Sequence, residues 1–226
     1  SGVSYVVNPE KITRPIHRAA TQIPITKAVI YEMSVRDFSM QKEAGFTYSG
    51  KFKSLTESPD LQEHTLGMDY VEQLGVTHIQ LMPVYDFGSV DENHPELVYN
   101  WGYDPMQYNL PDGSFATNPH DPYTRIVELQ GAIAAYHQAD ISVIMDVVYN
   151  HVYNPQTYAF EKIVPGYFFR YDHNANLTNG TFCGNDVASE RAMVRSYIKH
   201  SLKQWLTLYG MDGFRFDLMG ILDMET

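Results

Sequence analysis

The segment GFRFDLM (213–219) combines an apolar face with two charges that could take part in chemistry. Side chains two residues apart on an extended strand share a face, so we expect Arg215 and Asp217 to point the same way. Burying either charge alone would cost several kcal/mol, and an opposite charge nearby offsets part of that cost. The guanidinium would also keep Asp217 ionised at neutral pH. An ionised carboxylate held in place is the nucleophile that retaining sugar chemistry needs.

A second apolar segment, IMDVVYNH (144–151), carries polar groups that could lie beside this pair. Asp146 lies in the middle of the run, and Asn150 and His151 come at its end. If the two segments are neighbouring strands, a cation is flanked by two carboxylates, which compensates the burial of all three charges. The alternative is a buried ion pair that only ties strands together, and an arginine–aspartate pair by itself favours that alternative. The polar groups at the end of the second segment favour a catalytic site.

The segment YNWGYDP (99–105) places three aromatic residues, a glycine and an Asp-Pro turn within seven residues. Sugars present apolar C–H faces, so the ring of Trp101 or Tyr103 could form a stacking floor while Asp104 accepts hydrogen bonds from hydroxyl groups. The alternative is an aromatic loop that packs only on itself.

Metal and nucleotide motifs are absent from the sequence. The nine histidines are scattered, with no H-E-x-x-H and no Cys/His cluster, which disfavours zinc. Asp146 with Asn150 could contribute oxygen ligands to a calcium site, but two ligands are too few to define one. Neither G-x-x-x-x-G-K-[ST] nor G-x-G-x-x-G occurs, so nucleotide binding has no support. We therefore expect no metal and no cofactor.

Four short runs rich in apolar and β-branched residues predict the strands that position these groups: 28–33, 76–84, 141–149 and 213–219. Between them, apolar residues recur at spacings of three and four and predict three helices: 66–74, 123–137 and 189–209. Ser189 is the expected N-cap of the last helix, and Gly210 is its expected C-terminal glycine. The alternation of strand and helix predicts a parallel sheet with right-handed crossovers.

The predicted connections are of very unequal length. Those that leave the carboxyl ends of strands are long (33–66, 85–122 and 150–188), whereas those that return from helix to strand are only a few residues. In α/β folds function gathers at the carboxyl ends of the strands, so the long loops lie on the functional side. Residues 1–27 fit no unit of this pattern and are expected to be a linker or the tail of a preceding domain.

Bulk composition limits the partners of the chain. Its 226 residues carry 16 basic and 27 acidic side chains, a net charge of −11, which disfavours binding to nucleic acid or anionic membranes and indicates a neutral or cationic ligand. No apolar run approaches the ~20 residues of a membrane span. A single cysteine, Cys183, excludes an internal disulfide and favours the cytoplasm over secretion or the cell surface without settling the compartment.

Several of these segments resemble one family. The segments DVVYNH (146–151) and GFRFDLM (213–219) resemble two signature regions of the alpha-amylase family of glycoside hydrolases. YNWGYDP (99–105) resembles the loop motif of its type I pullulanases, bacterial enzymes that cleave α-1,6 branch points, and YEMSVRDFS (31–39) and GNDVASERAMVRSYI (184–198) are similar to further segments of that group. The resemblance runs from about residue 28 to residue 226, in the family's strand order.

The resemblance implies a (β/α)8 TIM-type barrel, of which residues 28–226 supply about the first four βα units, the N-terminal half. It also implies retaining hydrolysis of α-1,6 linkages in pullulan, glycogen, limit dextrins or other starch-derived dextrins. By resemblance Asp217 is the nucleophile and Arg215 orients it. His151 and Asp146 line the subsite of the cleaved sugar, and Tyr103 stacks beneath that sugar.

A retaining mechanism needs a second carboxyl group about 5 Å from the first, as general acid and then base. In the family this group is a glutamate after the fifth strand, beyond the residues that match here. We therefore expect the chain alone to be inactive and to work with the missing C-terminal half of the barrel. Two alternatives stay open: a non-catalytic carbohydrate-binding or assembly fragment, and another α-glucan enzyme of the family, such as a branching or transglycosylating one.

Overall fold

A four-stranded parallel sheet forms the centre of the computed structural model, which describes residues 4–12 and 23–226. Its strands are β1 (Ile30–Met33), β2 (His78–Leu81), β5 (Ser142–Val147) and β6 (Gly213–Phe216), hydrogen-bonded in the order β1-β2-β5-β6. All three pairings are parallel, and the order along the sheet follows the order along the chain. The parallel sheet predicted from the four apolar runs is confirmed, with strands shorter than the runs.

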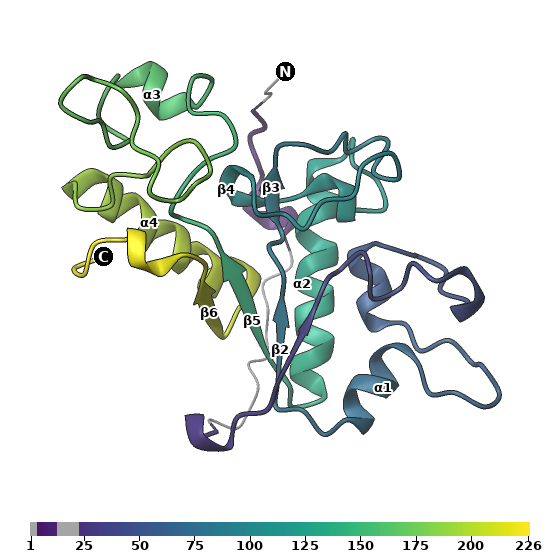
Figure 1. Cartoon of the computed structure of the whole chain (residues 1–226). Helices are drawn as coiled ribbons and strands as arrows, with labels where there is room; N and C mark the ends of the chain where they lie inside the picture. The colour runs from purple at the N-terminus through teal and green to yellow at the C-terminus, as the bar shows by residue number, and fades with distance from the viewer. Residues whose placement is uncertain (1–3, 13–22) are drawn as a thin grey trace.

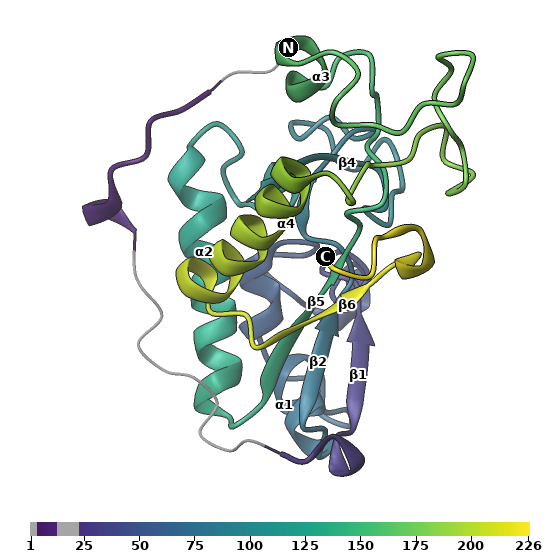
Figure 2. The same ribbon diagram turned by 90° about the vertical axis from the view of Figure 1, so that its left-hand side faces the viewer.

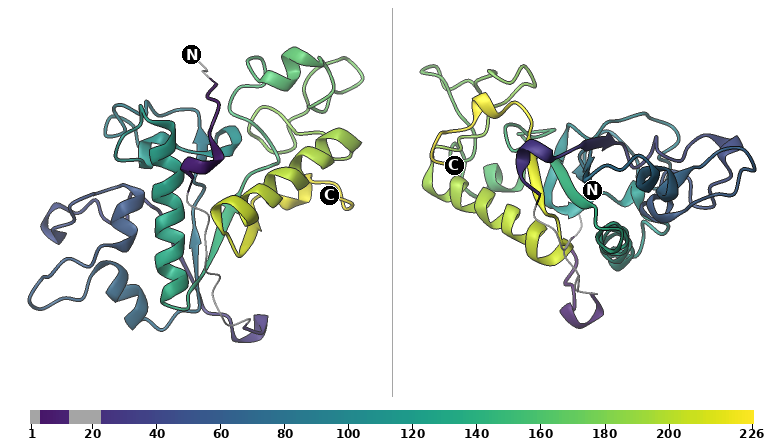
Figure 3. Two further views of the ribbon diagram at one scale, coloured as in Figure 1. Left: turned by 180° about the vertical axis from the view of Figure 1, so that it is seen from behind. Right: turned by 90° about the horizontal axis from the view of Figure 1, so that it is seen from below.

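One face of the sheet is buried because helices cover it, whereas residues on the opposite face of β2 and β5, such as Gln80 and Ile144, are partly exposed. Ile79, Val143, Met145 and Val147 are all fully inaccessible to solvent. Helices α2 (Pro122–Gln138) and α4 (Ala192–Gln204) lie along the same side of the sheet, as Figure 2 and the left view of Figure 3 show. They pack apolar residues onto it, which include Leu129, Ile133, Tyr136, Val194, Ile198 and, just after α4, Trp205.

Local sequence explains the start of α2 and the end of α4, but not the start of α4. Asp121 caps α2, since its side chain accepts a hydrogen bond from the Tyr123 amide, and Pro122 occupies the first turn. A π-helical turn (Trp205–Tyr209) prolongs α4 and ends at Gly210, whose φ of 85° is left-handed, as predicted. The expected cap at Ser189 is wrong. The N-cap residue is Arg191, which makes no side-chain cap, because the Ser189 hydroxyl instead accepts a hydrogen bond from the Asp223 amide at 2.8 Å.

The connection between β2 and α2 contains structure that the sequence pattern did not reveal. Strands β3 (Tyr85–Phe87) and β4 (Pro105–Pro111) pair antiparallel as a small separate sheet, with irregular register. The residues between them, 88–104, carry most of the aromatic segment. Residues 88–104 are called the aromatic loop below. Two shorter helices, α1 (Gly67–Gln73) and α3 (Ala159–Ile163), complete the fold.

The long connections lie beyond the carboxyl ends of the strands, as predicted. In Figure 1 the hairpin β3–β4 and the loop that carries α3 gather at that end of the sheet, while α1 lies toward the other end. No helix in the described part of the chain is long and apolar enough to cross a membrane.

The N-terminal segment was predicted to be a linker or domain tail, and residues 1–3 and 13–22 of it lie outside the described residues. The described part contacts the start of α2: the amide of Asn8 donates to the Tyr123 hydroxyl at 2.9 Å, and the Tyr5 and Tyr123 rings meet edge-on at 5.7 Å. Whether this segment leaves another domain stays a prediction.

Candidate active site

The register between β5 and β6 places Asp146 directly opposite Arg215. Nη1 of Arg215 lies 3.1 Å from both carboxylate oxygens of Asp146 and 2.8 Å from Oδ1 of Asp217. One nitrogen thus serves two carboxylates, which is the arrangement expected from the two apolar segments. The Asp146 side chain is fully inaccessible to solvent, whereas those of Arg215 and Asp217 are 47% and 21% exposed. The cluster is therefore closed at Asp146 and open to solvent at Arg215 and Asp217.

Tyr103 of the aromatic loop completes the surroundings of Asp146. Its hydroxyl donates to Oδ2 of Asp146 at 2.7 Å. Burial raises the pKa of Asp146, and the hydrogen bonds from Tyr103 and Arg215 act against that rise. Burial, together with the bond to Asp146, also raises the pKa of the Tyr103 phenol, so this hydroxyl remains a donor. Tyr103 is therefore fixed beside the ion pair by its polar tip, and its ring packs on the hydrophobic core.

Asp217 lies one residue beyond the end of β6, where backbone contacts fix its position. Its amide donates to the Val147 carbonyl at 2.9 Å, and its carbonyl accepts from Nδ2 of Asn150 at 2.7 Å. The next residue, Leu218, has a φ of 44°, a left-handed conformation that costs of order 1–3 kcal/mol outside glycine. The chain thus turns away from the sheet directly after Asp217, and this turn leaves the carboxylate at the edge of the solvent.

His151 connects the end of β5 with the aromatic loop. Nδ1 of the buried ring lies 2.5 Å from Oδ1 of Asn150, the same side chain that holds Asp217. Burial lowers the pKa of His151, and a bond to the Tyr103 backbone acts against that shift. Since the pKa falls below its ordinary value of about 6.5, the imidazole is mainly neutral at pH 7. Asn150 and His151 thus join the structure around Asp217 to the loop that presents Tyr103.

The other two predicted residues of the aromatic loop lie in different surroundings. Trp101 is 60% exposed, and its indole Nε1 donates to the Tyr99 hydroxyl at 2.8 Å. Both carboxylate oxygens of Asp104 accept bonds within the loop, Oδ2 from Ser89 at 2.6 Å and Oδ1 from Asn100 at 2.8 Å. Asp104 thus stabilises the loop, and its predicted contact with sugar hydroxyls stays a prediction.

The glycine of the aromatic segment is required by its backbone. Gly102 has a φ of 87°, and a Cβ atom there would lie 2.8 Å from the Pro83 carbonyl oxygen. Only glycine accommodates both the left-handed conformation and this close approach. The rings on either side of Gly102 can therefore face different partners, Tyr103 the ion pair and Trp101 the loop surface.

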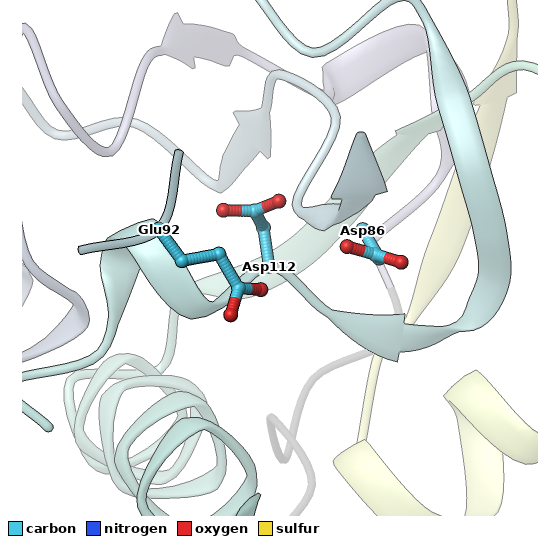
Figure 4. Close-up of side chains that lie close together, drawn as sticks. All are labelled: Asp86, Glu92 and Asp112. Carbon is cyan, nitrogen blue, oxygen red and sulfur yellow. The ribbon is translucent and has the colours of Figure 1, made fainter. Parts of the chain in front are cut away.

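One group of acidic side chains among the described residues has the spacing of metal ligands. Carboxylate oxygens of Asp86, Glu92 and Asp112 lie within 4.8 Å of one another, at the base of the hairpin β3–β4 (Figure 4). Arg125 binds both oxygens of Glu92 at 2.6 Å, and Asp112 accepts bonds from the amides of Phe87 and Ser114. This set is therefore partly neutralised by hydrogen bonds and an ion pair within the protein.

The calcium ligands considered from the sequence are also engaged with other groups. The oxygens of Asp146 accept bonds from Arg215 and Tyr103, and the amide oxygen of Asn150 faces His151. Their arrangement fits an ion-pair cluster better than a metal site.

Sequence reasoning missed Tyr99 and Asp37, which contact each other across 62 positions of sequence. Their positions could have indicated them, because both residues follow the carboxyl end of a strand and lie in segments that resemble the family.

Comparison with known proteins places these features in context. The family model for the alpha amylase catalytic domain matches residues 46–178. Pullulanase of Bacillus subtilis (strain 168) is 51% identical over 201 residues, which cover 88% of this chain and 28% of that protein. Pullulanase 1, chloroplastic, of Arabidopsis thaliana is 33% identical, covering 84% of this chain and 23% of that protein.

Among solved structures, the pullulanase from Anoxybacillus sp. LM18-11 complexed with maltotetraose superposes with a TM-score of 0.93 at 52% identity. The match covers 97% of this chain and 32% of that one. The chain thus spans less than a third of the length of these relatives. The matched residues belong to the catalytic domain, whose fold is a (β/α)8 barrel.

Proposed function

This chain belongs to the alpha-amylase family, and from that premise we propose that it forms the nucleophile side of an α-1,6-glucan debranching hydrolase. Residues 28–226 supply about the first four βα units of its catalytic (β/α)8 barrel. The substrates are pullulan, glycogen or starch-derived dextrins, a proposal that is supported by relatives named pullulanase and by one solved in complex with maltotetraose.

In the proposed first step, an oxygen of Asp217 attacks the anomeric carbon of the sugar at the branch point. A carbon–oxygen bond to Asp217 forms while the bond to the leaving O6 oxygen breaks, and a general acid gives that oxygen a proton. Water then attacks the same carbon in the second step, and Asp217 is released as a carboxylate. We propose that the acid/base is a glutamate from the C-terminal half of the barrel, a partner to these residues.

The single observation that carries this proposal is the shared contact of one guanidinium nitrogen with Asp146 and Asp217 at the carboxyl ends of adjacent strands. A purely structural ion pair needs neither the partial exposure of Asp217 nor a turn that aims it outward. Arg215 orients the nucleophile and favours its ionised form. Tyr103 presents its ring beneath the cleaved sugar, where Asp146 and His151 line the same subsite, and Trp101 and Asp104 belong to the loop that holds the glucan.

The experiment is maltotriose release from pullulan by the protein assembled with the C-terminal half of its barrel. We expect Asp217→Asn to lower turnover by roughly 1,000-fold or more, because the amide cannot form the covalent intermediate. The matched control is Asp60→Asn, which removes an exposed carboxylate outside the cluster. Maltotetraose binding should survive in Asp217→Asn.

Undiminished cleavage by the Asp217→Asn protein would show that the nucleophile is another group. Binding of maltotetraose without any turnover in the assembled wild type would favour the non-catalytic alternative. The chain without its partner half is expected to bind weakly and to release no maltotriose.

A further inference from the structure

Two loops that lie far apart in sequence meet at Tyr99. The loop after β1 contributes Arg36 and Asp37, and the aromatic loop contributes Tyr99. The Tyr99 hydroxyl donates to Oδ2 of Asp37, and the guanidinium carbon of Arg36 lies 5.0 Å from the centre of the Tyr99 ring. Arg36 also pairs with Asp37, Nη1 to Oδ1, at 3.2 Å. Tyr99 is therefore held at both its hydroxyl and its ring face.

Tyr99 in turn holds Trp101. The indole Nε1 of Trp101 donates to the Tyr99 hydroxyl at 2.8 Å, and the two rings meet edge to face, 6.4 Å apart at 84°. The hydrogen bonds thus run from Trp101 to Tyr99 to Asp37. The indole is thus fixed by its N–H and by the Tyr99 ring, and Trp101 is still 60% exposed.

An exposed tryptophan held in one orientation is suited to bind an apolar surface. Fixing the ring in advance lowers the entropy that a ligand must offset on binding. The C–H face of a glucose unit is such a surface, and aromatic rings stack on it. A cavity of about 330 Å³ adjoins the site, and its walls include Arg36, Val98 and Asn100, so the surroundings also offer polar groups for hydroxyls.

This place is separate from the ion pair. The Arg36 and Asp37 anchors follow β1 at one edge of the described sheet, whereas Arg215 belongs to β6 at the other edge. The rings of Trp101 and Tyr103 flank Gly102 and bond to different partners, Tyr99 and Asp146. We therefore expect a sugar on Trp101 to be a different unit of the glucan from the one at Asp217.

We propose that Tyr99 and Asp37 are positioning residues that fix Trp101 as a stacking platform for a glucose unit other than the one that is cleaved. The inference rests on the proposed function for the identity of the ligand, an α-glucan chain. It adds a second contact point for that chain, built jointly by the loop after β1 and the aromatic loop.

The test is a maltotetraose titration followed by tryptophan fluorescence, in the Asp217→Asn background of the assembled protein to prevent turnover. The chain contains two tryptophans, and Trp205 is fully buried, so quenching by acrylamide reports on Trp101 within this chain. Tryptophans contributed by the partner half are replaced by phenylalanine. We expect Tyr99→Phe, which keeps the ring but breaks both hydrogen bonds, to raise quenching of Trp101 and to weaken maltotetraose binding about fivefold.

A matched series separates positioning from general damage. Asp37→Asn keeps an oxygen acceptor for Tyr99 and should bind nearly as the parent does, whereas Asp37→Ala should repeat the Tyr99→Phe effect. The two damaging changes together should cost no more than one alone, because both break the same chain of bonds. Tyr70→Phe, on the exposed side of α1, is the control and should change neither quenching nor binding. On pullulan, in the active background, Tyr99→Phe should raise KM and leave kcat within twofold.

Unchanged quenching and binding in Tyr99→Phe would overturn the inference, as would equal losses in Asp37→Asn and Asp37→Ala. A titration in which maltotetraose leaves the fluorescence of Trp101 unchanged would also overturn the inference. Pullulan cleavage by the same assembled protein would still support the proposed function. Conversely, pullulan turnover that survives Asp217→Asn would refute the nucleophile, and the Trp101 titration would stay valid because maltotetraose contains no α-1,6 linkage.

Discussion

Replacing Arg215 with glutamine should destabilise the protein in a way that depends on pH. The change removes the cation that contacts both oxygens of the buried Asp146 carboxylate. Within the part of the chain that the structure describes, the Tyr103 hydroxyl is then its remaining side-chain donor. Breaking a fully buried ion pair costs about 3–5 kcal/mol of folding free energy, because one charge is left uncompensated. Arg215 is 47% exposed, so solvent screens part of its interaction, and the discounted cost is about 1–2 kcal/mol at pH 8.

The sign of the pH dependence follows from Asp146. Burial already raises its pKa, and loss of Arg215 removes an interaction that lowers it. A carboxyl group whose pKa is higher in the folded than in the unfolded state binds protons preferentially when folded, so its ionisation costs stability as pH rises. The cost of Arg215→Gln should therefore increase as pH rises and be larger at pH 8 than at pH 5.

Thermal unfolding at pH 5 and pH 8 measures this difference. A cost of 1–2 kcal/mol corresponds to a drop in Tm of roughly 2–8 °C for a domain of this size. Arg195→Gln is the matched control, since Arg195 pairs with Asp223 and Glu225, and because the pKa of Asp223 lies below its ordinary value the cost should be the same at both pH values. Adding Asp146→Asn to Arg215→Gln should restore stability at pH 8. An equal loss at both pH values, or no recovery in the double variant, would refute the reasoning.

Three further outcomes follow from the structure. Burial and neighbouring acids raise the pKa of Asp86 to about 7, above its unfolded value of about 3.9. Asp86→Asn should therefore raise Tm at pH 8 and not at pH 4. Equal shifts in Tm at the two pH values, measured by calorimetry, would contradict this. Gly102→Ala should cost about 1–3 kcal/mol in urea unfolding, because the methyl group meets the Pro83 carbonyl; an unchanged midpoint would count against it. Asn150→Ala should lower kcat on pullulan by roughly 10- to 100-fold and retain maltotetraose affinity, because it removes the hydrogen bond to the Asp217 carbonyl. A loss of maltotetraose affinity with kcat unchanged would contradict this.

The sheet and the central ion pair could be predicted from the sequence because both depend on short-range patterns. Apolar runs of six to nine residues predicted four strands in the right order, and two-residue spacing placed Arg215 and Asp217 together. The register of β5 against β6 then brought Asp146 opposite Arg215. Even so, Asp217 lies one residue past its strand, since the left-handed Leu218 ends the pairing there.

The features that could not be predicted depend on contacts between distant segments. Strand β4 begins and ends with proline and pairs irregularly with the three residues of β3, so no alternation of apolar residues marks the hairpin. The Ser189 cap failed because the Asp223 amide, 34 positions away, takes the hydroxyl. The bond between Tyr99 and Asp37 likewise follows from the arrangement of two loops and from no local pattern.

The central claim is that Asp217 attacks the anomeric carbon. Reaction of the assembled protein with a 5-fluoro-α-glucosyl fluoride, followed by peptide mapping, tests it most directly, since fluoride leaves without a proton and the electron-withdrawing ring fluorine slows the release of a glycosyl-enzyme. We predict a single glycosyl adduct on the peptide that contains GFRFDLM, located at Asp217 and absent from Asp217→Asn. An adduct on Asp146 or elsewhere, or a protein that hydrolyses the fluoride without ever forming one, would contradict the account.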